Sequence, residues 1–194
     1  MIRVAMIVPA AGLSLRHPPN KLLLDLDGVP VIVRALSVFQ GMGIDLFVVL
    51  GHQEDEVRNV VEGAEIKEVR YVHNPDYSSG MASSMKAGLN AVGGSYDYCG
   101  ISLADKPFIR RETLTTLLSV LEKKTPLILA PSHNDQAGHP IFFHISLLDE
   151  LMSAQGETGG REVREKHRSE TVLMPVKDEG VVLDMDEFLE RQRG

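Results

Sequence analysis

The sequence has few of the features that mark secreted or membrane proteins. It contains a single cysteine, Cys99, which excludes an intramolecular disulfide and fits the reducing cytoplasm. No apolar run approaches the ~18 residues that suggest a membrane span, and the first residues predict a strand and a turn rather than a signal peptide. We therefore expect a cytoplasmic protein with no membrane contact.

Positive charge is also scarce, with 20 Lys and Arg residues against 27 Asp and Glu residues and a net charge of −7. This balance argues against a nucleic-acid-binding protein, which needs a basic surface, but it leaves room for a local cationic pocket. The 194 residues can bury a substantial core, and no repeat, low-complexity tract or linker divides them. We expect residues 1–194 to form a single domain.

Strand and helix patterns alternate along the whole chain, which predicts an α/β fold with a largely parallel sheet. Apolar runs predict strands at residues 3–8, 46–50, 68–72, 98–103, 127–130, 141–143 and 172–176. Helical patterns predict helices near residues 31–42, 53–62, 79–89, 114–121, 146–153 and from 186 onward. The polar stretch from Ser132 to Gly138 is expected to be an exposed loop. In open sheets of this class, ligands bind beyond the carboxyl ends of the strands.

A run of small residues, Ala10-Ala11-Gly12, follows the first predicted strand, and Ser14, Arg16 and Lys21 lie in the same loop. Small residues let backbone N–H groups approach a phosphate closely, and the two cations can neutralise it. The loop therefore predicts a phosphate site, with an ordinary strand-to-helix connection as the alternative. It matches neither G-x-G-x-x-G nor G-x-x-x-x-G-K-[ST], which argues against a dinucleotide-binding Rossmann enzyme and a P-loop NTPase.

Asp105 directly follows a hydrophobic strand, so its carboxylate should project into the crevice at the sheet edge. Mg²⁺ is commonly held by one or two carboxylates together with substrate phosphates, so a metal at Asp105 could bridge phosphates bound by the first loop. The alternative is that Asp105 caps the following turn or pairs with Lys106. The spacing of His133, His139 and His144 matches no compact set of metal ligands.

Six segments in order resemble motifs of the molybdenum-cofactor nucleotidyltransferases of the MobA/MocA type. They are VPAAGLSLR…NKLLL, NPDYSSGMASSMKAGL, LADKPF, GHPIFF, GETGGREV and VVLDMDEFLE. The A-A-G-x-S form of the first motif is more similar to the cytidylyltransferases than to the guanylyltransferases, which usually carry A-G-G. The resemblance implies a Rossmann-like, three-layer nucleotidyltransferase fold (GT-A-like) with a mostly parallel mixed sheet.

The resemblance also implies a reaction in which a substrate phosphate attacks the α-phosphorus of an NTP and pyrophosphate leaves. CTP is favoured over GTP, and the acceptor is a phosphorylated small molecule such as molybdopterin, with a molybdoenzyme or its chaperone as a further partner. Nucleotide contacts are implied for Ala10, Ala11, Gly12, Ser14, Asn74, Gly80 and Ser84. By the same resemblance, the catalytic cations Arg16 and Lys21 hold the triphosphate and stabilise the departing pyrophosphate. Asp105 is implied to bind Mg²⁺, and Asp184 or Asp186 is implied to complete the metal site.

The chain departs from the family pattern in the first motif and beside the predicted metal ligand. Pro9 replaces an aliphatic residue, His17-Pro18-Pro19 follows Arg16, and Lys106 follows Asp105 where Met or Gln is common. Two alternatives therefore stay open. One is a nucleotidyltransferase for a sugar phosphate or another small acceptor. The other is a nucleotide-binding regulator or cofactor chaperone without turnover.

Overall fold

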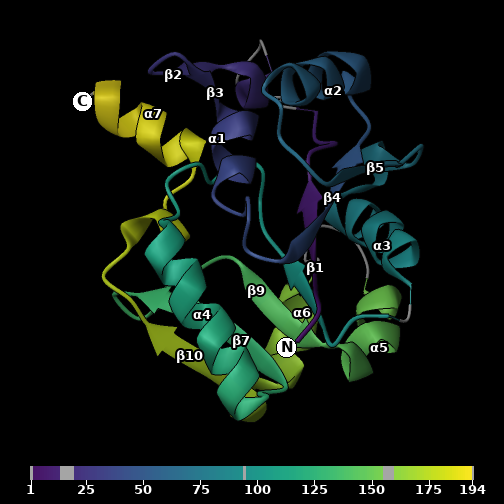
Figure 1. The fold of residues 1–194 in the computed structure, drawn as a ribbon, viewed down its shortest axis with the longest axis vertical. Helices are drawn as coiled ribbons and strands as arrows, with labels where there is room; N and C mark the ends of the chain where they lie inside the picture. The colour runs from purple at the N-terminus through teal and green to yellow at the C-terminus, as the bar shows by residue number, and fades with distance from the viewer. Residues whose placement is uncertain (1, 14–19, 94, 155–159, 194) are drawn as a thin grey trace.

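The computed structural model describes residues 2–13, 20–93, 95–154 and 160–193 (Figure 1). Its main sheet has the strand order β10-β7-β9-β6-β1-β4-β5, with β8 paired to β7. The strands are β1 (Val4–Pro9), β4 (Ile44–Leu50), β5 (Val69–His73), β6 (Tyr98–Ile101), β7 (Ile128–His133), β8 (Gln136–Ala137), β9 (Ile141–His144) and β10 (Thr171–Pro175). A separate small hairpin joins β2 (Asp25–Leu26) to β3 (Val29–Pro30).

The sheet is parallel except at β9, which runs antiparallel to both β6 and β7, and at the short strand β8. The predicted mostly parallel mixed sheet is thereby confirmed. Central strand β1 pairs in parallel with β4 on one side and β6 on the other. The loops that follow these three strands therefore leave from the same edge of the sheet.

Helices cover both faces of the sheet (Figure 1). They are α1 (Val31–Ser37), α2 (Glu54–Gly63), α3 (Met81–Val92), α4 (Arg111–Lys124), α5 (Leu148–Ser153), α6 (Arg161–Lys166) and α7 (Met185–Arg193). Short 3₁₀ turns are η1 (Lys21–Leu23), η2 (Tyr77–Ser79), η3 (Ile145–Leu147), η4 (Arg168–Glu170) and η5 (Glu179–Val181). No helix in these described ranges is long and apolar enough to span a bilayer.

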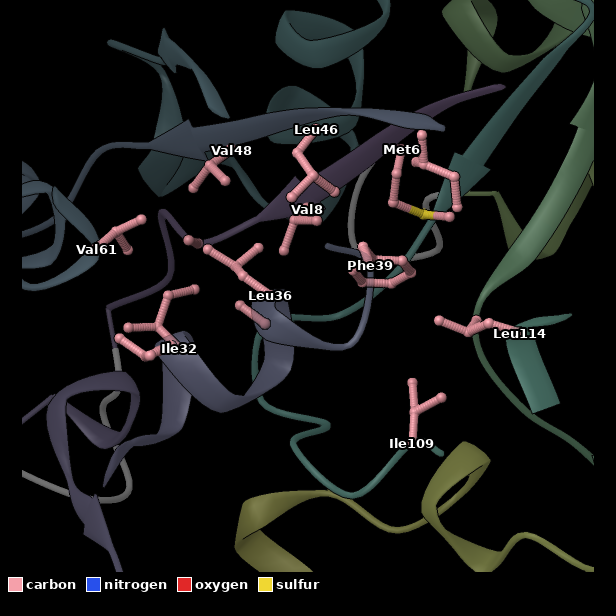
Figure 2. Packing of buried hydrophobic residues seen from close by; sticks show 14 of the residues in the cluster. Met6, Val8, Ile32, Leu36, Phe39, Leu46, Val48, Val61, Ile109 and Leu114 are labelled. Carbon is pink, nitrogen blue, oxygen red and sulfur yellow. The ribbon is translucent and has the colours of Figure 1, made fainter. Parts of the chain in front are cut away.

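Alternate residues of β1 point into two separate hydrophobic cores. Met6 and Val8 pack with Leu36 of α1 and with Phe39 just after it, in a core to which α2 and α4 also contribute residues (Figure 2). Ile7 belongs to the second core, to which α3, α5 and α6 contribute. A strand buried on both faces gains about 1.5–3 kcal/mol per large apolar side chain, which explains why β1 reads as a continuous apolar run.

Gly88 lets α3 lie directly against the sheet. A Cβ atom at this position would lie 2.5 Å from Ile7 Cγ2 and 3.2 Å from Val49 Cγ2, closer than packed side chains tolerate. The close approach fixes the course of α3 across β1 and β4, so that its N-terminus stands at the carboxyl edge of the sheet.

The segment 132–138 is not the exposed loop that its polar composition predicts. Strand β7 continues to His133 and turns through Asn134 and Asp135, which have φ values of 48° and 63°, into β8. Asn and Asp tolerate this left-handed conformation, which tight hairpins need. Ser132 is buried in the ladder, so polar side chains here mark a hairpin at the sheet rather than a loop outside it.

Candidate active site

A cavity of about 370 Å³ opens at the carboxyl edge of the sheet. Its walls come from the segment after β1, the start of η1, the N-terminal part of α3, the segment after β6 and one residue of α7. The described lining residues are Pro9, Ala10, Ala11, Gly12, Leu13, Asn20, Lys21, Leu22, Tyr77, Ser78, Gly80, Met81, Ser84, Leu103, Ala104, Asp105 and Asp186. The cavity thus joins the segments that the sequence motifs single out.

Three charged side chains meet in the wall of this cavity. Lys21 Nζ lies 2.7 Å from Asp105 Oδ2 and 3.2 Å from each carboxylate oxygen of Asp186. Partial burial lowers the pKa of Lys21, but the attraction of Asp105 and Asp186 outweighs it, so the net effect raises this pKa. Lys21 is therefore held as an ammonium ion between two carboxylates.

Asn20 sets the geometry of Lys21. Its side-chain Oδ1 accepts a hydrogen bond from Leu22 N at 3.1 Å and so caps η1, the turn that carries Lys21. Leu22 is buried in the core below the turn. The cap and the buried leucine together fix the side of η1 from which Lys21 reaches the two carboxylates.

Asp105 retains one unused oxygen. Its Oδ1 is buried, and no donor in the described parts of the chain lies within hydrogen-bond distance of it. A buried carboxylate oxygen without a donor is unfavourable unless a cation binds it, and carboxylate oxygens are the protein ligands that Mg²⁺ and Mn²⁺ prefer. Asp105 and Asp186, both held by one ammonium nitrogen, therefore fit a divalent cation.

The two carboxylates do not form a complete protein cage for a metal. No group of three or more His, Cys, Asp or Glu side chains suited to a metal occurs within the described ranges. Mg²⁺ usually takes only one or two carboxylates and completes its shell with water and substrate phosphates. The arrangement matches that pattern rather than a structural metal site.

The small-residue segment after β1 forms the floor of the cavity. Ala10 donates its N–H to Val49 O at 2.8 Å, and Ala11 O accepts from His52 N at 3.3 Å, so both are tied to the neighbouring strand β4 and its loop. The Ala10 N–H is thus committed to the fold and is not a phosphate donor. Gly12 is exposed, and a Cβ there would meet no described atom within 4 Å. Ser14, Arg16 and the run His17-Pro18-Pro19 lie outside the described residues.

Asn74 organises the α3 side of the cavity from behind. Its Nδ2 donates to Ser83 Oγ at 2.9 Å and to Ser84 Oγ at 3.0 Å, and its Oδ1 accepts from Asp76 N at 3.0 Å. The described cavity wall includes Gly80 and Ser84 but not Asn74, which is buried. Asn74 therefore positions the start of α3 instead of lining the space that the sequence assigned to it.

Asp184 and Asp186 have different roles although they are two residues apart. Asp184 Oδ1 accepts from Glu187 N at 2.9 Å and caps α7, as an N-terminal carboxylate does. Asp186 projects into the cavity wall beside Lys21. Of the two candidates offered by the sequence, the structure brings Asp186, and not Asp184, to Asp105.

Lys106 points away from the cavity. Its ammonium donates to Val182 O, and the side chain is only 6% exposed. Burial lowers the pKa of Lys106, while Asp184, Asp105 and Glu187 act in the opposite direction. The cation beside the predicted metal ligand is thus committed to a backbone carbonyl and does not enter the cavity wall.

Tyr77 and Met81 are among the lining residues that were not predicted from the sequence. Tyr77 stands at the cavity because Gly51 follows β4: a Cβ at Gly51 would lie 2.7 Å from Tyr77 Cβ. Met81, which helical spacing assigned to the core, also lines the cavity, while Met85 one turn later is buried as expected. The glycine after an apolar strand and the aromatic in the Asn-Pro turn are the signals that could have indicated the Tyr77 contact.

Comparison with known proteins identifies the family of the chain. Residues 6–172 match the model of the MobA-like NTP transferase domain family. The molybdenum cofactor cytidylyltransferase of Escherichia coli K12 is 23% identical over 96% of this chain and 92% of its own.

Two solved structures have the same fold. The Rv0371c homologue from Mycobacterium sp. strain JC1 is 27% identical, with a TM-score of 0.84 over 98% of this chain and 94% of its own. Rv0371c of Mycobacterium tuberculosis H37Rv, in complex with manganese, is 23% identical, with a TM-score of 0.76 over 97% of each chain. The predicted Rossmann-like nucleotidyltransferase fold is confirmed, and this chain belongs to the MobA-like NTP transferase family and is a nucleotidyltransferase.

Proposed function

We propose that the protein is a divalent-metal-dependent cytidylyltransferase. It transfers a cytidylyl group from CTP to a phosphorylated acceptor, with molybdopterin as that acceptor, and releases pyrophosphate. The observation that carries the proposal is the group formed by Lys21, Asp105 and Asp186 in the wall of a nucleotide-sized cavity. Nucleotidyl transfer needs in-line positioning and neutralised phosphate charge more than covalent help from the protein.

Asp105 and Asp186 are the residues that would hold Mg²⁺ or Mn²⁺. When bound, this ion neutralises phosphate charge and polarises the phosphorus that is attacked. The unused Asp105 Oδ1 supports the assignment, as does the divalent-metal complex of the mycobacterial neighbour. In this proposal the two carboxylates would hold the metal beside the α-phosphate, and Asp105 reaches the cavity from the turn after β6.

Lys21 neutralises the triphosphate. Its ammonium has three N–H donors on a flexible stem, so it can bind a phosphate oxygen while remaining near the carboxylates. On the departing pyrophosphate the same charge stabilises the leaving oxygen. Arg16, four residues before the start of the described segment at Asn20, remains proposed as the second cation.

The N-terminal part of α3 supplies further polar groups to the cavity lining. Gly80, with φ 110°, precedes the helix, and the first backbone N–H groups of a helix attract anions. Ser84 Oγ, held by Asn74, adds a hydroxyl in the same wall. We propose that these groups contact the ribose and the phosphates, and that the small residues Ala10 and Ala11 contact the nucleoside.

Two observations support CTP and molybdopterin. The A-A-G form of the first motif is more similar to cytidylyltransferases, and the Escherichia coli relative that spans nearly the whole chain is a molybdenum cofactor cytidylyltransferase. Lys106 was one of the two reasons to consider a protein without turnover, and its charge is directed at Val182 O; the other, the run His17-Pro18-Pro19, lies outside the described residues.

The test is a pyrophosphate-release assay with CTP, GTP, ATP or UTP, with molybdopterin as acceptor, and with Mg²⁺, Mn²⁺ or EDTA. We expect release with CTP at least about tenfold faster than with GTP, and none with EDTA. A parallel assay with a sugar phosphate as acceptor distinguishes a sugar-phosphate nucleotidyltransferase from the molybdopterin cytidylyltransferase proposed here. Tight CTP binding without pyrophosphate release from any acceptor would contradict the proposal and favour a regulator.

A further inference from the structure

Lys106 is a buried ammonium that the proposed reaction does not use. Burying a charge in a protein is costly unless it is paired or hydrogen-bonded, so its partner indicates what it does. That partner is the carbonyl of Val182, a residue just before α7. Val182 lies four positions before Asp186, the carboxylate that completes the group at the cavity.

The segment from Val182 to Asp186 is held at both ends by two consecutive residues of the turn after β6. Lys106 Nζ donates to Val182 O, and Asp105 O accepts from Met185 N at 2.9 Å. Met185 is buried at 1% exposure, so the second bond is shielded from water. The turn that carries one carboxylate of the site thereby also fixes the approach of the segment that carries the other.

Neighbouring contacts support the same segment from its other side. Val181 O accepts from His139 N at 2.8 Å, and Gly180 lies so close to Phe108 that a Cβ would stand 2.1 Å from Phe108 O. These contacts anchor residues before Val182 but do not reach α7. The hydrogen bond from Lys106 to Val182 O is therefore the side-chain contact by which the turn carrying Asp105 holds the segment that leads to Asp186.

An anchor is needed because the carboxylates repel one another. Asp105 and Asp186 both lie within 3.2 Å of one nitrogen, and Asp184 stands at the start of the same helix. That nitrogen is the Lys21 ammonium, which offsets only part of the charge of the three carboxylates, so the remaining repulsion favours a movement of α7 away from the turn after β6. Lys106 opposes that movement with both its charge and its hydrogen bond.

We propose that Lys106 is a positioning residue that holds the Val182–Asp186 segment against the turn after β6 and so sets the distance between the Asp186 and Asp105 carboxylates. The consequence for divalent-metal binding rests on the proposed function. The consequence for the segment itself does not, because it concerns the protein without metal or nucleotide.

The first arm of the test is amide hydrogen exchange of the free protein, with the Met185 amide as the reporter. Lys106→Met removes the charge and the donor at similar volume, and Lys106→Arg retains both. We expect exchange at Met185 to accelerate about tenfold or more in Lys106→Met and to stay near the wild-type rate in Lys106→Arg. Leu121→Ala, in the core at the far end of α4, controls for a general loss of stability.

The second arm has two measurements. One is a Mn²⁺ binding titration monitored by electron paramagnetic resonance, with CTP present and no acceptor. The other is steady-state kinetics with the acceptor added, at varied Mn²⁺ concentration. We expect Lys106→Met to bind Mn²⁺ about three- to tenfold more weakly and to recover most of its kcat at saturating Mn²⁺, so that the metal KM changes more than kcat. Leu121→Ala should leave Mn²⁺ affinity unchanged.

Unchanged exchange at Met185 in Lys106→Met overturns the proposal. So does faster exchange with wild-type Mn²⁺ affinity, or an equal response of Leu121→Ala in both arms. If the wild-type protein neither binds Mn²⁺ with CTP nor turns over any NTP, the proposed function fails, and the exchange arm alone decides the role of Lys106.

Discussion

Lys21 Nζ lies 2.7 Å from Asp105 Oδ2, and the same nitrogen contacts Asp186, 165 residues later in the chain. One ammonium thus joins the turn after β1, the end of β6 and the start of α7. The Lys21 and Asp105 side chains are only 20% and 19% exposed, so solvent screens their attraction less than that of a surface pair. The charges of this site depend on one another, and removing any one leaves the others unbalanced.

Lys21→Gln should lower kcat/KM for CTP by about 10²–10³-fold, because the triphosphate and the departing pyrophosphate lose the one Lys or Arg among the described lining residues of the cavity. The free energy of unfolding should fall by about 1–2 kcal/mol, since two partly buried carboxylates lose an ionic hydrogen bond. Kinetics and urea unfolding measure the two effects. Lys123→Gln, on the exposed C-terminal turn of α4, is the matched control and should change neither.

Asp186→Asn and Asp184→Asn form a matched pair two residues apart. Asp186→Asn should reduce kcat by about 10²-fold or more and raise the metal KM, since it removes a proposed ligand. Asp184→Asn should retain activity within about threefold, because an asparagine oxygen can still accept from Glu187 N at the helix cap. If Asp184→Asn raised the Mg²⁺ KM and lowered kcat more than Asp186→Asn did, Asp184 would be the metal ligand instead.

Asn74→Ala should weaken nucleotide binding without removing a cavity residue. The variant loses the hydrogen bonds that hold Ser83, Ser84 and the turn at Asp76, so we expect a KM for CTP about three- to tenfold higher and a stability loss of about 2–3 kcal/mol. Asn90→Ala, at an exposed position of α3, should leave both unchanged. A wild-type KM in Asn74→Ala would show that α3 does not need this anchor.

His139 should make the protein less stable in acid. Burial lowers the pKa of this imidazole to about 4, although its hydrogen bond with Ile101 O acts the other way. In the unfolded chain the pKa is near 6.5, so the unfolded state binds more protons between about pH 6.5 and 4, and stability falls as pH falls through this window.

The loss attributable to His139 should reach up to about 3 kcal/mol at pH 4. His139→Gln retains an N–H that can donate to Ile101 O but does not titrate, so its stability should depend less on pH over the same window. Urea unfolding of both proteins at pH 7, 5.5 and 4.5 measures the difference. Parallel stability curves would show that His139 is protonated alike in both states.

The sheet, and the places of Lys21 and Asp105 beside the cavity, could be predicted from local patterns. Strand β1 is apolar throughout because both of its faces are buried, and Asp105 follows a strand whose end faces the crevice. Lys21 stands in a recognisable motif after the small-residue turn. In each case the residues of one short segment determine its structure, so the position of the strand or side chain can be predicted from that segment alone.

The choice between Asp184 and Asp186 could not be predicted in the same way. Which aspartate faces the cavity depends on where α7 begins, and that is set by the burial of Met185 and its hydrogen bond to Asp105 O. That Asn74 acts from behind the cavity wall could not be predicted for a similar reason. Its partners Ser83 and Ser84 lie in another element, and only the packed fold shows that they take up its donors.

The most direct test of the account is pyrophosphate release by Asp105→Asn with CTP, Mg²⁺ and molybdopterin. The change removes the carboxylate charge with little change in volume, so we expect turnover to fall by about 10³-fold or more while the thermal midpoint moves by only a few degrees. Turnover within about tenfold of wild type, in a folded variant, would contradict the assignment of Asp105 as the metal ligand and with it the proposed mechanism.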